Sequence, residues 1–339
     1  MRALVTGAGG FLGQYLVEQL VARGDRVRTL ARGDYPALAR LGVETVRADL
    51  RDRATTIDAC ADIDVVFHAA GVAGIWGPWE HYYGINYLGT ENVIQGCRQY
   101  RVPRLVYTSS PSVTFDGTAQ EGVDESAPYP DRWLCHYPHT KALGEQAVLT
   151  ANSDELLTCA LRPHLIWGPR DQHLIPRLIE RARSGSLRRV GDGANHVDMV
   201  YVENAASAHL QAAEALKPGS PVAGRAYFIS QGEPVNCWNW IDEILGLAGL
   251  PPVRRSISLA AAWRVGAVLE MGYRLLGRTS EPRMTRFLAA QLGTSHYFDI
   301  SRARRDFGYE AKISTAEGMQ RLAASLAGSV SRPTAHRTR

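Results

Sequence analysis

A glycine-rich segment near the start of the chain constrains the fold more than any other feature. It reads Thr6-Gly7-Ala8-Gly9-Gly10-Phe11-Leu12-Gly13, and it lies between an apolar run at residues 2–6 and a helical pattern that stops at Gly24. Glycines at such a position let the chain leave a strand sharply and enter a helix that packs closely against it. The segment therefore predicts the first strand–turn–helix unit of an α/β sheet.

Further strand-like and helix-like segments alternate up to about residue 165. The candidate strands are short and rich in β-branched residues, and the segments between them space apolar residues by three and four. This alternation predicts an α/β fold with a doubly wound parallel sheet, the Rossmann architecture. The predicted strands after the first are Arg26–Leu30, Val43–Ala48, Asp64–His68, Arg104–Ser109 and Leu157–Arg162, and the later predicted helices span 82–100 and 137–151.

Beyond residue 165 the pattern loosens, and Pro-Gly turns separate shorter elements. We expect a dinucleotide-binding core at residues 1–165 and a mixed region at 166–328, which completes the sheet and interleaves with it a smaller substrate lobe. The polar and basic residues 329–339 predict a disordered tail.

Composition excludes several classes of protein. The net charge is only +4, and no basic stripe with interleaved aromatic residues is present, so we expect no nucleic-acid partner. No apolar run reaches the roughly 18 residues of a membrane span. The five cysteines show neither a Cys-x-x-Cys motif nor zinc-ligand spacing, which favours reduced thiols, no metal and a cytoplasmic location.

Residues 259–276 form an apolar stripe at helical spacing, flanked by charged residues. Two interpretations stay open at this point. The segment is either a helix that packs on the substrate lobe, or a helix that contacts a membrane surface or a partner protein while it admits a greasy substrate.

The glycine-rich turn is typical of a site for a dinucleotide pyrophosphate, whose charge the helix N-terminus meets. The second strand ends Leu30-Ala31-Arg32, without the carboxylate that would repel a 2′-phosphate, so Arg32 favours NADP(H). Asp34, two residues further on, is the observation against it. The predicted cofactor contacts are Gly7, Gly10, Phe11, Leu12, Gly13 and Arg32, with Asp49 and Leu50 near the adenine and His68, Ala69 and Ala70 beside the cofactor backbone.

Tyr137 and Lys141 stand four residues apart in a predicted helix, so both side chains share one face. A nearby ammonium favours the phenolate of a tyrosine and lowers its pKa, so this pair is suited to proton exchange with a carbonyl oxygen. Ser110 closes the strand about thirty residues upstream, where its hydroxyl can donate a hydrogen bond to the same carbonyl. These three residues are the predicted catalytic group.

Four motifs occur together along nearly the whole chain: Thr6-Gly7-x-x-Gly10-x-x-Gly13, Tyr107-Thr108-Ser109-Ser110, Tyr137-x-x-x-Lys141 and Arg162-Pro163-x-x-x-x-Gly168-Pro169. This combination resembles the extended short-chain dehydrogenases/reductases, and within them the 3β-hydroxysteroid dehydrogenase branch. The stretches Arg104–Thr114, Leu161–Gln172 and Tyr227–Pro234 are similar to bacterial reductases of 2-alkyl-3-oxoalkanoic acids in long-chain olefin biosynthesis.

The resemblance implies a role for each predicted residue. Ser110 takes the catalytic Ser/Thr position, Tyr137 donates the proton and Lys141 contacts the nicotinamide ribose, while Pro163 and Leu165 line the nicotinamide. It further implies NADPH-dependent reduction of a hydrophobic keto acid to the hydroxy acid, and a homodimer built from helices 82–100 and 137–151, with a larger multi-enzyme complex left open. Trp76, Trp79, Tyr82 and Tyr83 either roof the substrate pocket or form the core of their loop.

Four rival functions remain open. A sterol dehydrogenase of the same branch would oxidise a 3β-hydroxyl group, although Arg32 suits a net reductant better. A nucleotide-sugar epimerase would normally carry the acidic residue that is absent at Ala31, and a sugar-nucleotide dehydratase would carry one after Ser110, where the chain has Pro111. A non-catalytic dinucleotide sensor or scaffold tends to lose the tyrosine or the lysine, and this chain has both.

Overall fold

The computed structural model of the chain describes residues 1–330. Its last helix, α13 (Thr315–Val330), includes Ser329 and Val330, the first two residues of the predicted tail. The rest of that tail, residues 331–339, lies outside the described residues.

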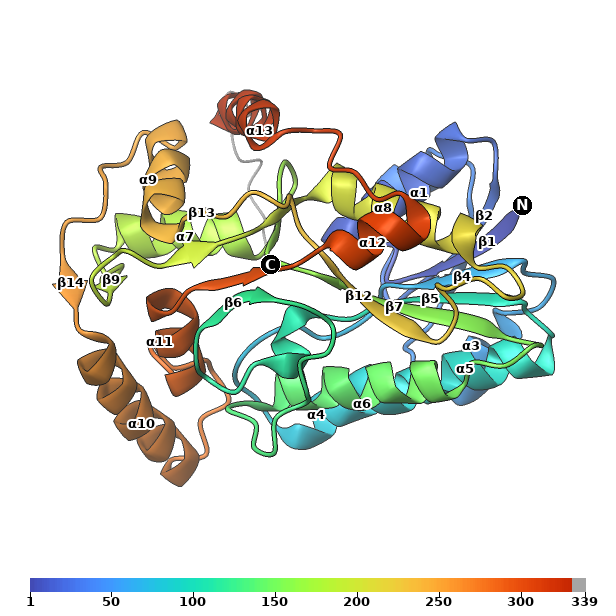
Figure 1. Cartoon of the computed structure of the whole chain (residues 1–339), viewed down its shortest axis with the longest axis horizontal. Helices are drawn as coiled ribbons and strands as arrows, with labels where there is room; N and C mark the ends of the chain where they lie inside the picture. The colour runs from blue at the N-terminus through green and yellow to red at the C-terminus, as the bar shows by residue number, and fades with distance from the viewer. Residues whose placement is uncertain (331–339) are drawn as a thin grey trace.

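A seven-stranded sheet runs through the centre of the molecule (Figure 1). Its strands follow the order β12-β7-β5-β4-β1-β2-β3, and every neighbouring pair is parallel. The predicted doubly wound parallel sheet is therefore confirmed. The strands are β1 (Arg2–Thr6), β2 (Arg26–Ala31), β3 (Glu44–Arg47), β4 (Val65–His68), β5 (Arg104–Thr108), β7 (Leu157–Pro163) and β12 (Arg225–Ile229).

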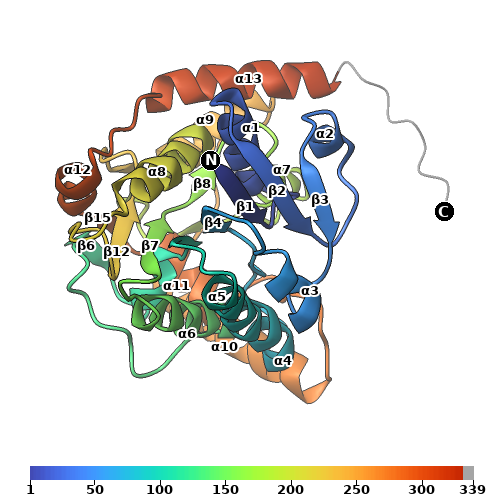
Figure 2. The same cartoon turned by 90° about the vertical axis from the view of Figure 1, so that its right-hand side faces the viewer.

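Helices cover both faces of this sheet (Figure 2). On one face α1 (Phe11–Ala22) packs with α8 (Val202–Ala215) over a core that includes Leu16 and Phe67. On the other face α3 (Arg53–Asp58), α5 (Gly89–Gln99) and α6 (His136–Thr150) enclose a second core around Val66 and Leu105. Both faces are covered because the parallel strands are apolar on both sides.

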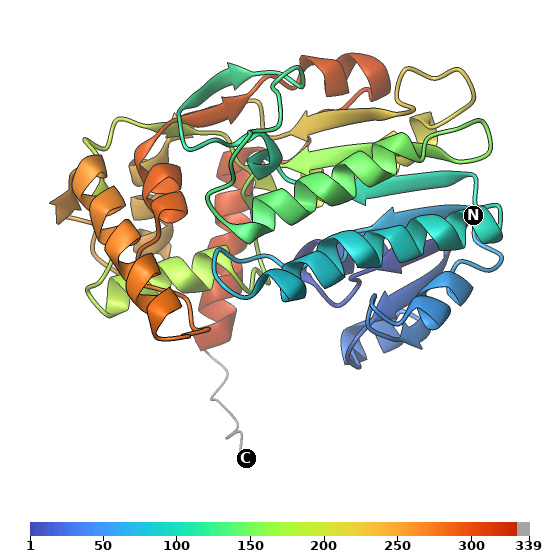
Figure 3. The ribbon, with the colours of Figure 1, turned by 90° about the horizontal axis from the view of Figure 1, so that it is seen from below.

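Two long helical stretches lie side by side under the sheet (Figure 3). One is α6, and the other is a continuous run of α4 (Trp79–Tyr83), a π-helical turn η1 (Gly84–Leu88) and α5. They agree closely with the predicted helices 137–151 and 82–100. The π turn inserts an extra residue into the helix, a feature that often marks functional sites.

The second half of the chain builds a lobe at the carboxyl end of the sheet strands (Figure 1). The lobe contains a small sheet of order β13-β10-β15-β6, in which β6 (Gln120–Val123) comes from the first half of the chain. Its other strands are β10 (His196–Val197), β13 (Val235–Asn236) and β15 (His296–Phe298), and its helices are α7 (Leu174–Arg183), α9 (Cys237–Leu247), α10 (Leu259–Leu275) and α11 (Arg286–Gly293).

Short elements complete the chain. Two further pairs of strands, β8 with β11 and β9 with β14, are parallel. The elements not yet given are α2 (Pro36–Ala39), the 3₁₀ turn η2 (Pro111–Thr114), β8 (Ile166–Trp167), β9 (Arg189–Val190), β11 (Val200–Tyr201), β14 (Ser256–Ile257) and α12 (Ser301–Phe307).

Helix α10 coincides with the apolar stripe noted in the sequence. One face packs on α11, where a Cβ atom at Gly266 would lie 2.6 Å from the carbonyl carbon of Thr285. The opposite face carries large apolar side chains in solvent, with Leu275 81% exposed, and includes Val265, Val268 and Met271. The helix therefore packs on the lobe and also presents a second apolar face, whose contact with a membrane surface or partner stays a prediction. Within residues 1–330, no helix has the length and apolar character needed to cross a bilayer.

Candidate active site

The turn between β1 and α1 contains three glycines, Gly7, Gly9 and Gly10, so it presents mainly backbone atoms, and we call it the glycine cradle. Gly7 has φ of +70°, and a Cβ atom there would lie 2.6 Å from Cα of Ala70. A Cβ atom at Gly13 would lie 2.2 Å from the carbonyl oxygen of Gly7. Gly10 is the N-cap of α1 and offers no side-chain cap, so the N–H groups of the first helical turn remain for an anion. The backbone geometry predicted for the glycine turn is therefore present, and its role in binding a phosphate stays a prediction.

A long cleft opens beside this cradle in two connected halves. One half is a cavity of about 430 Å³ that reaches Ser110 and Tyr137. The other is a cavity of about 370 Å³ that reaches Arg32 and Asp49. Both are lined by Gly7, Gly10, Ala69, Gly71, Ala73 and His173. The predicted residues Phe11, Leu12, Gly13, Pro163 and Leu165 line the first half, and Leu50 and Ala70 line the second.

The electrostatics of the second half favour an anion. Arg32 is exposed and lines the cavity. Asp34 does not line it and instead forms an ion pair with Arg47, whose Nη1 lies 3.1 Å from Asp34 Oδ2. Asp49 receives a two-pronged contact from Arg51, which together with the charge of Arg32 lowers the pKa of Asp49 to about 2. The residue that argued against a phosphate site in the sequence is thus paired elsewhere.

Tyr35 also belongs to this half of the cleft, although no sequence motif pointed to it. Its ring lies directly on the glycine turn, since a Cβ atom at Gly9 would be 1.9 Å from Cζ of Tyr35. The side chain lines the cavity together with Arg32. Only the folded chain brings residue 35 back over residue 9.

His68 departs from its predicted position beside the cofactor. The side chain is fully buried beneath the cleft and does not line either half. Nδ1 lies 2.7 Å from Thr6 Oγ1, and Nε2 lies 2.9 Å from Thr90 Oγ1. Burial, and secondarily the charge of Lys141, lowers the pKa of His68 to about 3. His68 is therefore a neutral imidazole that links Thr6 to Thr90 by hydrogen bonds beneath the cleft. It does not reach the cleft because its ring points from the strand into the core.

Ser110 and Tyr137 meet in the first half of the cleft. Ser110 follows β5 and caps η2, with its Oγ 2.8 Å from Ser112 Oγ and accepting a hydrogen bond from the Ser112 N–H at 3.3 Å. Tyr137 stands in the first turn of α6. Burial raises the pKa of Tyr137, while a hydrogen bond with Ser110 lowers it. The two predicted catalytic hydroxyls are therefore neighbours at the end of one strand and the start of one helix.

Lys141 lies just behind them and is 5% exposed. Its Nζ donates a hydrogen bond of 2.6 Å to the Thr108 carbonyl and lies 4.0 Å from the centre of the Tyr107 ring. Burial lowers the pKa of Lys141 to about 7, against the opposing effect of Glu145. The expected lowering of the Tyr137 pKa is not found, because burial dominates that pKa and the ammonium is directed at Thr108.

Asn86 is a second residue that the sequence did not single out. It lies in the π-helical turn and is 1% exposed. Its Oδ1 accepts from the Val72 N–H at 2.7 Å, and its Nδ2 donates to Val72 O and Thr140 Oγ1, both at 3.1 Å. Asn86 thus ties the loop after β4 to α6, the helix that carries Tyr137 and Lys141. Only the extra residue of the π turn hints at such a position.

The wall of the first half that faces away from the glycines comes from the lobe. It includes Phe115 and Phe287, whose rings meet edge to face at 5.7 Å, and the histidines His164 and His296. These residues come from three regions far apart along the chain, at residues 115, 164 and 287–296. The sequence placed Pro163 and Leu165 there but had no signal for the rest.

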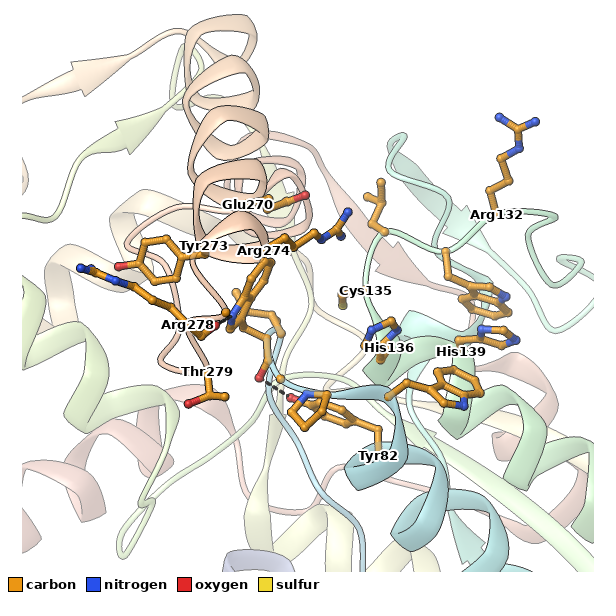
Figure 4. Close-up of a pocket in the computed structure, with 18 of the residues that line it drawn as sticks. Tyr82, Arg132, Cys135, His136, His139, Glu270, Tyr273, Arg274, Arg278 and Thr279 are labelled. Carbon is orange, nitrogen blue, oxygen red and sulfur yellow. Dashed lines mark hydrogen bonds between the residues drawn. The ribbon is translucent and has the colours of Figure 1, made fainter.

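A separate cavity of about 820 Å³ lies between α10 and the start of α6 (Figure 4). It is lined by Trp76, Trp79 and Tyr82, with the Tyr82 hydroxyl donating a 2.9 Å hydrogen bond to Trp76 O. Tyr83 stacks on Trp79. The loop aromatics therefore do border a cavity, but not the one that contains Ser110 and Tyr137. An apolar cluster around Phe115, Phe287, Ile75 and Leu134 has members in the walls of both cavities.

Comparison with known proteins agrees with this geometry. The 2-alkyl-3-oxoalkanoate reductase of Stenotrophomonas maltophilia is 50% identical over 96% of this chain and 100% of its own length. Human sterol-4-alpha-carboxylate 3-dehydrogenase, decarboxylating, is 36% identical over 96% of this chain and 88% of its own. Among solved structures, MoeE5 in complex with UDP-glucose and NAD superposes with a TM-score of 0.76 at 26% identity, covering 98% of this chain and 100% of that one. A sequence model of the 3-beta hydroxysteroid dehydrogenase/isomerase family matches residues 4–259, and the chain belongs to that family.

Proposed function

We propose that this protein reduces a 2-alkyl-3-oxoalkanoic acid to the 2-alkyl-3-hydroxyalkanoic acid with NADPH. The observation that carries the proposal is the single cleft that joins the glycine cradle and Arg32 to Ser110 and Tyr137. The similarity to a 2-alkyl-3-oxoalkanoate reductase over nearly the whole chain supports the choice of substrate.

The residues of the first half divide the chemistry among them. Ser110 donates a hydrogen bond to the keto oxygen, while Ser112 fixes its hydroxyl from the other side. Tyr137 gives its phenolic proton to that oxygen as the alcohol forms, since its raised pKa keeps the proton in place until then. A bound nicotinamide supplies the hydride. Lys141, close to the loop at Gly71, is positioned to contact a ribose hydroxyl, and its position rests on Thr108.

The residues present fit a dinucleotide, because side chains at Gly7 and Gly13 would collide with neighbouring backbone, and only glycines allow this tight turn beside the uncapped N-terminus of α1. A nicotinamide cofactor also follows from membership of the family. We infer NADP(H) from the second half of the cleft, where Arg32 is free to pair with a 2′-phosphate and Asp34 is paired with Arg47.

We also propose that the protein is a homodimer through α5 and α6, as its resemblance to the extended short-chain dehydrogenases implies. Leu88, at the end of the π turn, is 45% exposed on this face, and the neighbouring rings of Tyr83 and Tyr87 are in tilted contact with their centroids 5.0 Å apart. Replacing Leu88 by Glu should release monomers, which light scattering after size exclusion would detect. A wild-type protein that elutes as a monomer would contradict the proposal.

The test of the activity runs the reaction in reverse. Purified protein is mixed with a racemic 2-alkyl-3-hydroxy acid and NADP⁺ or NAD⁺, and the absorbance of the reduced nicotinamide is followed. Turnover with NADP⁺ that disappears in Tyr137→Phe is the expected result. Turnover with NAD⁺ alone would overturn the inference from Arg32. Activity on a 3β-hydroxysterol and none on the hydroxy acid would assign the protein to the sterol dehydrogenases of its family.

A further inference from the structure

Two buried histidines form part of the wall of the cavity that contains Ser110 and Tyr137. His164 follows β7 and His296 begins β15, and both line the cavity although they are 6% and 2% exposed. Their rings meet edge to face with centroids 4.9 Å apart, and His164 Nε2 lies 3.0 Å from His296 Nδ1. The two side chains are therefore one hydrogen-bonded unit, which we call the histidine pair.

Both ends of the histidine pair face backbone carbonyls. His164 Nδ1 contacts the carbonyl oxygen of Asp198, and His296 Nε2 lies 2.7 Å from that of Gln291. A carbonyl oxygen only accepts, so each outer nitrogen must carry a proton to make its bond. The inner contact between the rings needs one more. Three N–H groups are thus required.

Two neutral imidazoles carry only one N–H each. In a neutral pair, one of the three contacts therefore has no proton, and two nitrogen or oxygen lone pairs face each other there. A pair with one added proton has three N–H groups, one for each contact. Burial opposes that proton, because it lowers the pKa of both rings, and each positive ring would further disfavour the other. An anion placed in the cavity would act in the opposite direction.

The cavity offers such an anion little other countercharge. Among the described residues that line it there is no lysine or arginine, and its remaining titratable groups are Tyr137, Asp171 and His173. Asp171 is committed to the N–H groups that begin α7, and His173 is exposed at the mouth.

Charged groups on the surrounding elements are also accounted for. Arg162 of β7 is paired with Glu145, and Arg286 of α11 is paired with Glu270. The carboxylate of Asp198, next to the pair, accepts hydrogen bonds from the Ser230 hydroxyl and the Gly232 N–H. His196 of β10 and Glu121 of β6 are exposed. Lys141 of α6 lies behind Tyr137, where its Nζ donates to the Thr108 carbonyl, and its side chain does not line the cavity. Within the cavity wall itself, the histidine pair is therefore the buried group best placed to become positive beside a bound anion.

We propose that the histidine pair takes up one proton from solvent when the carboxylate of the substrate enters the cavity, and so recognises an acid in preference to a neutral ketone. This inference rests on the proposed function. The balance is simple: one N–H bond forms on the pair, one proton leaves the buffer, and the carboxylate stays ionised.

The test compares a 2-alkyl-3-hydroxy acid with its methyl ester as substrates of the whole enzyme across pH. The KM of the acid should rise about tenfold per pH unit between the pKa of the pair in the free enzyme and its higher pKa in the complex, because binding in this range takes up a proton that becomes scarcer as the pH rises. The KM of the ester should not follow. We therefore compare the ratio of the two KM values. Effects of the titration of Tyr137 and of the cofactor cancel in this ratio, because they act on both substrates alike.

A matched pair of variants locates the effect. His296→Gln should remove the pH dependence of the acid-to-ester ratio and lower the preference for the acid at least tenfold, mainly through KM. His196→Gln, an exposed histidine on the neighbouring strand, should leave both unchanged. An unaltered ratio in His296→Gln would overturn the inference.

A spectroscopic measurement on the wild-type protein avoids any doubt about folding of the variant. Nitrogen-15 spectra of labelled histidine should show the pair with three N–H groups in the acid complex and two in the ester complex. Three in the ligand-free enzyme, or two with the acid bound, would overturn the inference. Failure of the wild type to oxidise the acid would instead overturn the proposed function, and this inference with it.

Discussion

Glu145 on α6 and Arg162 on β7 form an ion pair that is almost completely hidden from solvent. Arg162 Nε and Nη2 donate to the carboxylate at 3.0 and 2.6 Å, and the two side chains are 4% and 0% exposed for Arg162 and Glu145. The Tyr129 hydroxyl donates to the same carboxylate at 2.6 Å. Since Lys141 lies one helical turn before Glu145, the pair anchors the helix that carries Tyr137 and Lys141 to the sheet.

Glu145→Gln should therefore lower the free energy of unfolding by about 3–5 kcal/mol, because it leaves the Arg162 charge buried without a partner. The control is Glu18→Gln, which breaks the ion pair with Arg170, whose side chains are 38% and 39% exposed for Glu18 and Arg170. That change should cost no more than about 1 kcal/mol. Urea unfolding of the two variants measures both, and equal losses would refute the argument.

Arg32→Ala should reduce kcat/KM for NADPH by about 10- to 100-fold, the worth of a charge-assisted hydrogen bond. The value for NADH should change little, since Arg32 then has no phosphate to meet. Arg40→Ala, an exposed arginine outside the cleft, serves as the control. Steady-state rates with both cofactors decide the matter, and an equal loss for NADH would show that Arg32 acts on something other than the phosphate.

Lys141 makes the stability of the protein depend on pH. Its pKa is about 7 in the folded chain against 10.5 as the ordinary value. Between these values the unfolded chain holds a proton that the folded chain has released, so stability rises with pH through this window. Lys141→Met lacks this contribution, and its stability relative to wild type should be greatest below pH 7 and fall as the pH rises. Unfolding measured on both proteins at about pH 6.5 and about pH 9 checks the sign.

Gly13→Ala should abolish cofactor binding and cost about 1–3 kcal/mol of stability, because the new Cβ atom would sit 2.2 Å from the Gly7 carbonyl oxygen. Gly246→Ala in α9 meets no atom within 4 Å and should raise stability by about 0.5–1 kcal/mol. Thermal unfolding with and without NADPH separates the two. A Gly13→Ala protein that NADPH still stabilises would contradict the role of the cradle.

The main sheet was predictable from the sequence because its strands are buried on both sides and end at recognisable turns. The predicted Arg2–Thr6 coincides with β1, and Leu157–Arg162 differs from β7 by one residue. The small sheet of the lobe was not predictable. Strands such as β10 (His196–Val197) are too short to show a period, and they depend on pairing with segments about a hundred residues away.

The same distinction applies to the site. The glycine turn, Ser110, Tyr137 and Lys141 follow rules that act within one strand end or one helical turn, and the structure places them in or beside the cleft. The far wall was beyond such rules, because Phe115, Phe287 and the histidine pair meet only through tertiary packing. His68 was misplaced for a related reason, since position at a strand end does not say which way a side chain points.

The pairing of Glu270 with Arg286 connects α10, which carries the exposed apolar face, to the start of α11. Glu270 accepts from the backbone N–H and the guanidinium of Arg286, and the next residue, Phe287, lines the cavity beside Tyr137. We therefore expect a displacement of α10 to move that wall as well. If a substrate moved Phe287, reciprocity would require it to change the affinity of the outer apolar face for a ligand bound there, and each surface would then respond to occupancy of the other.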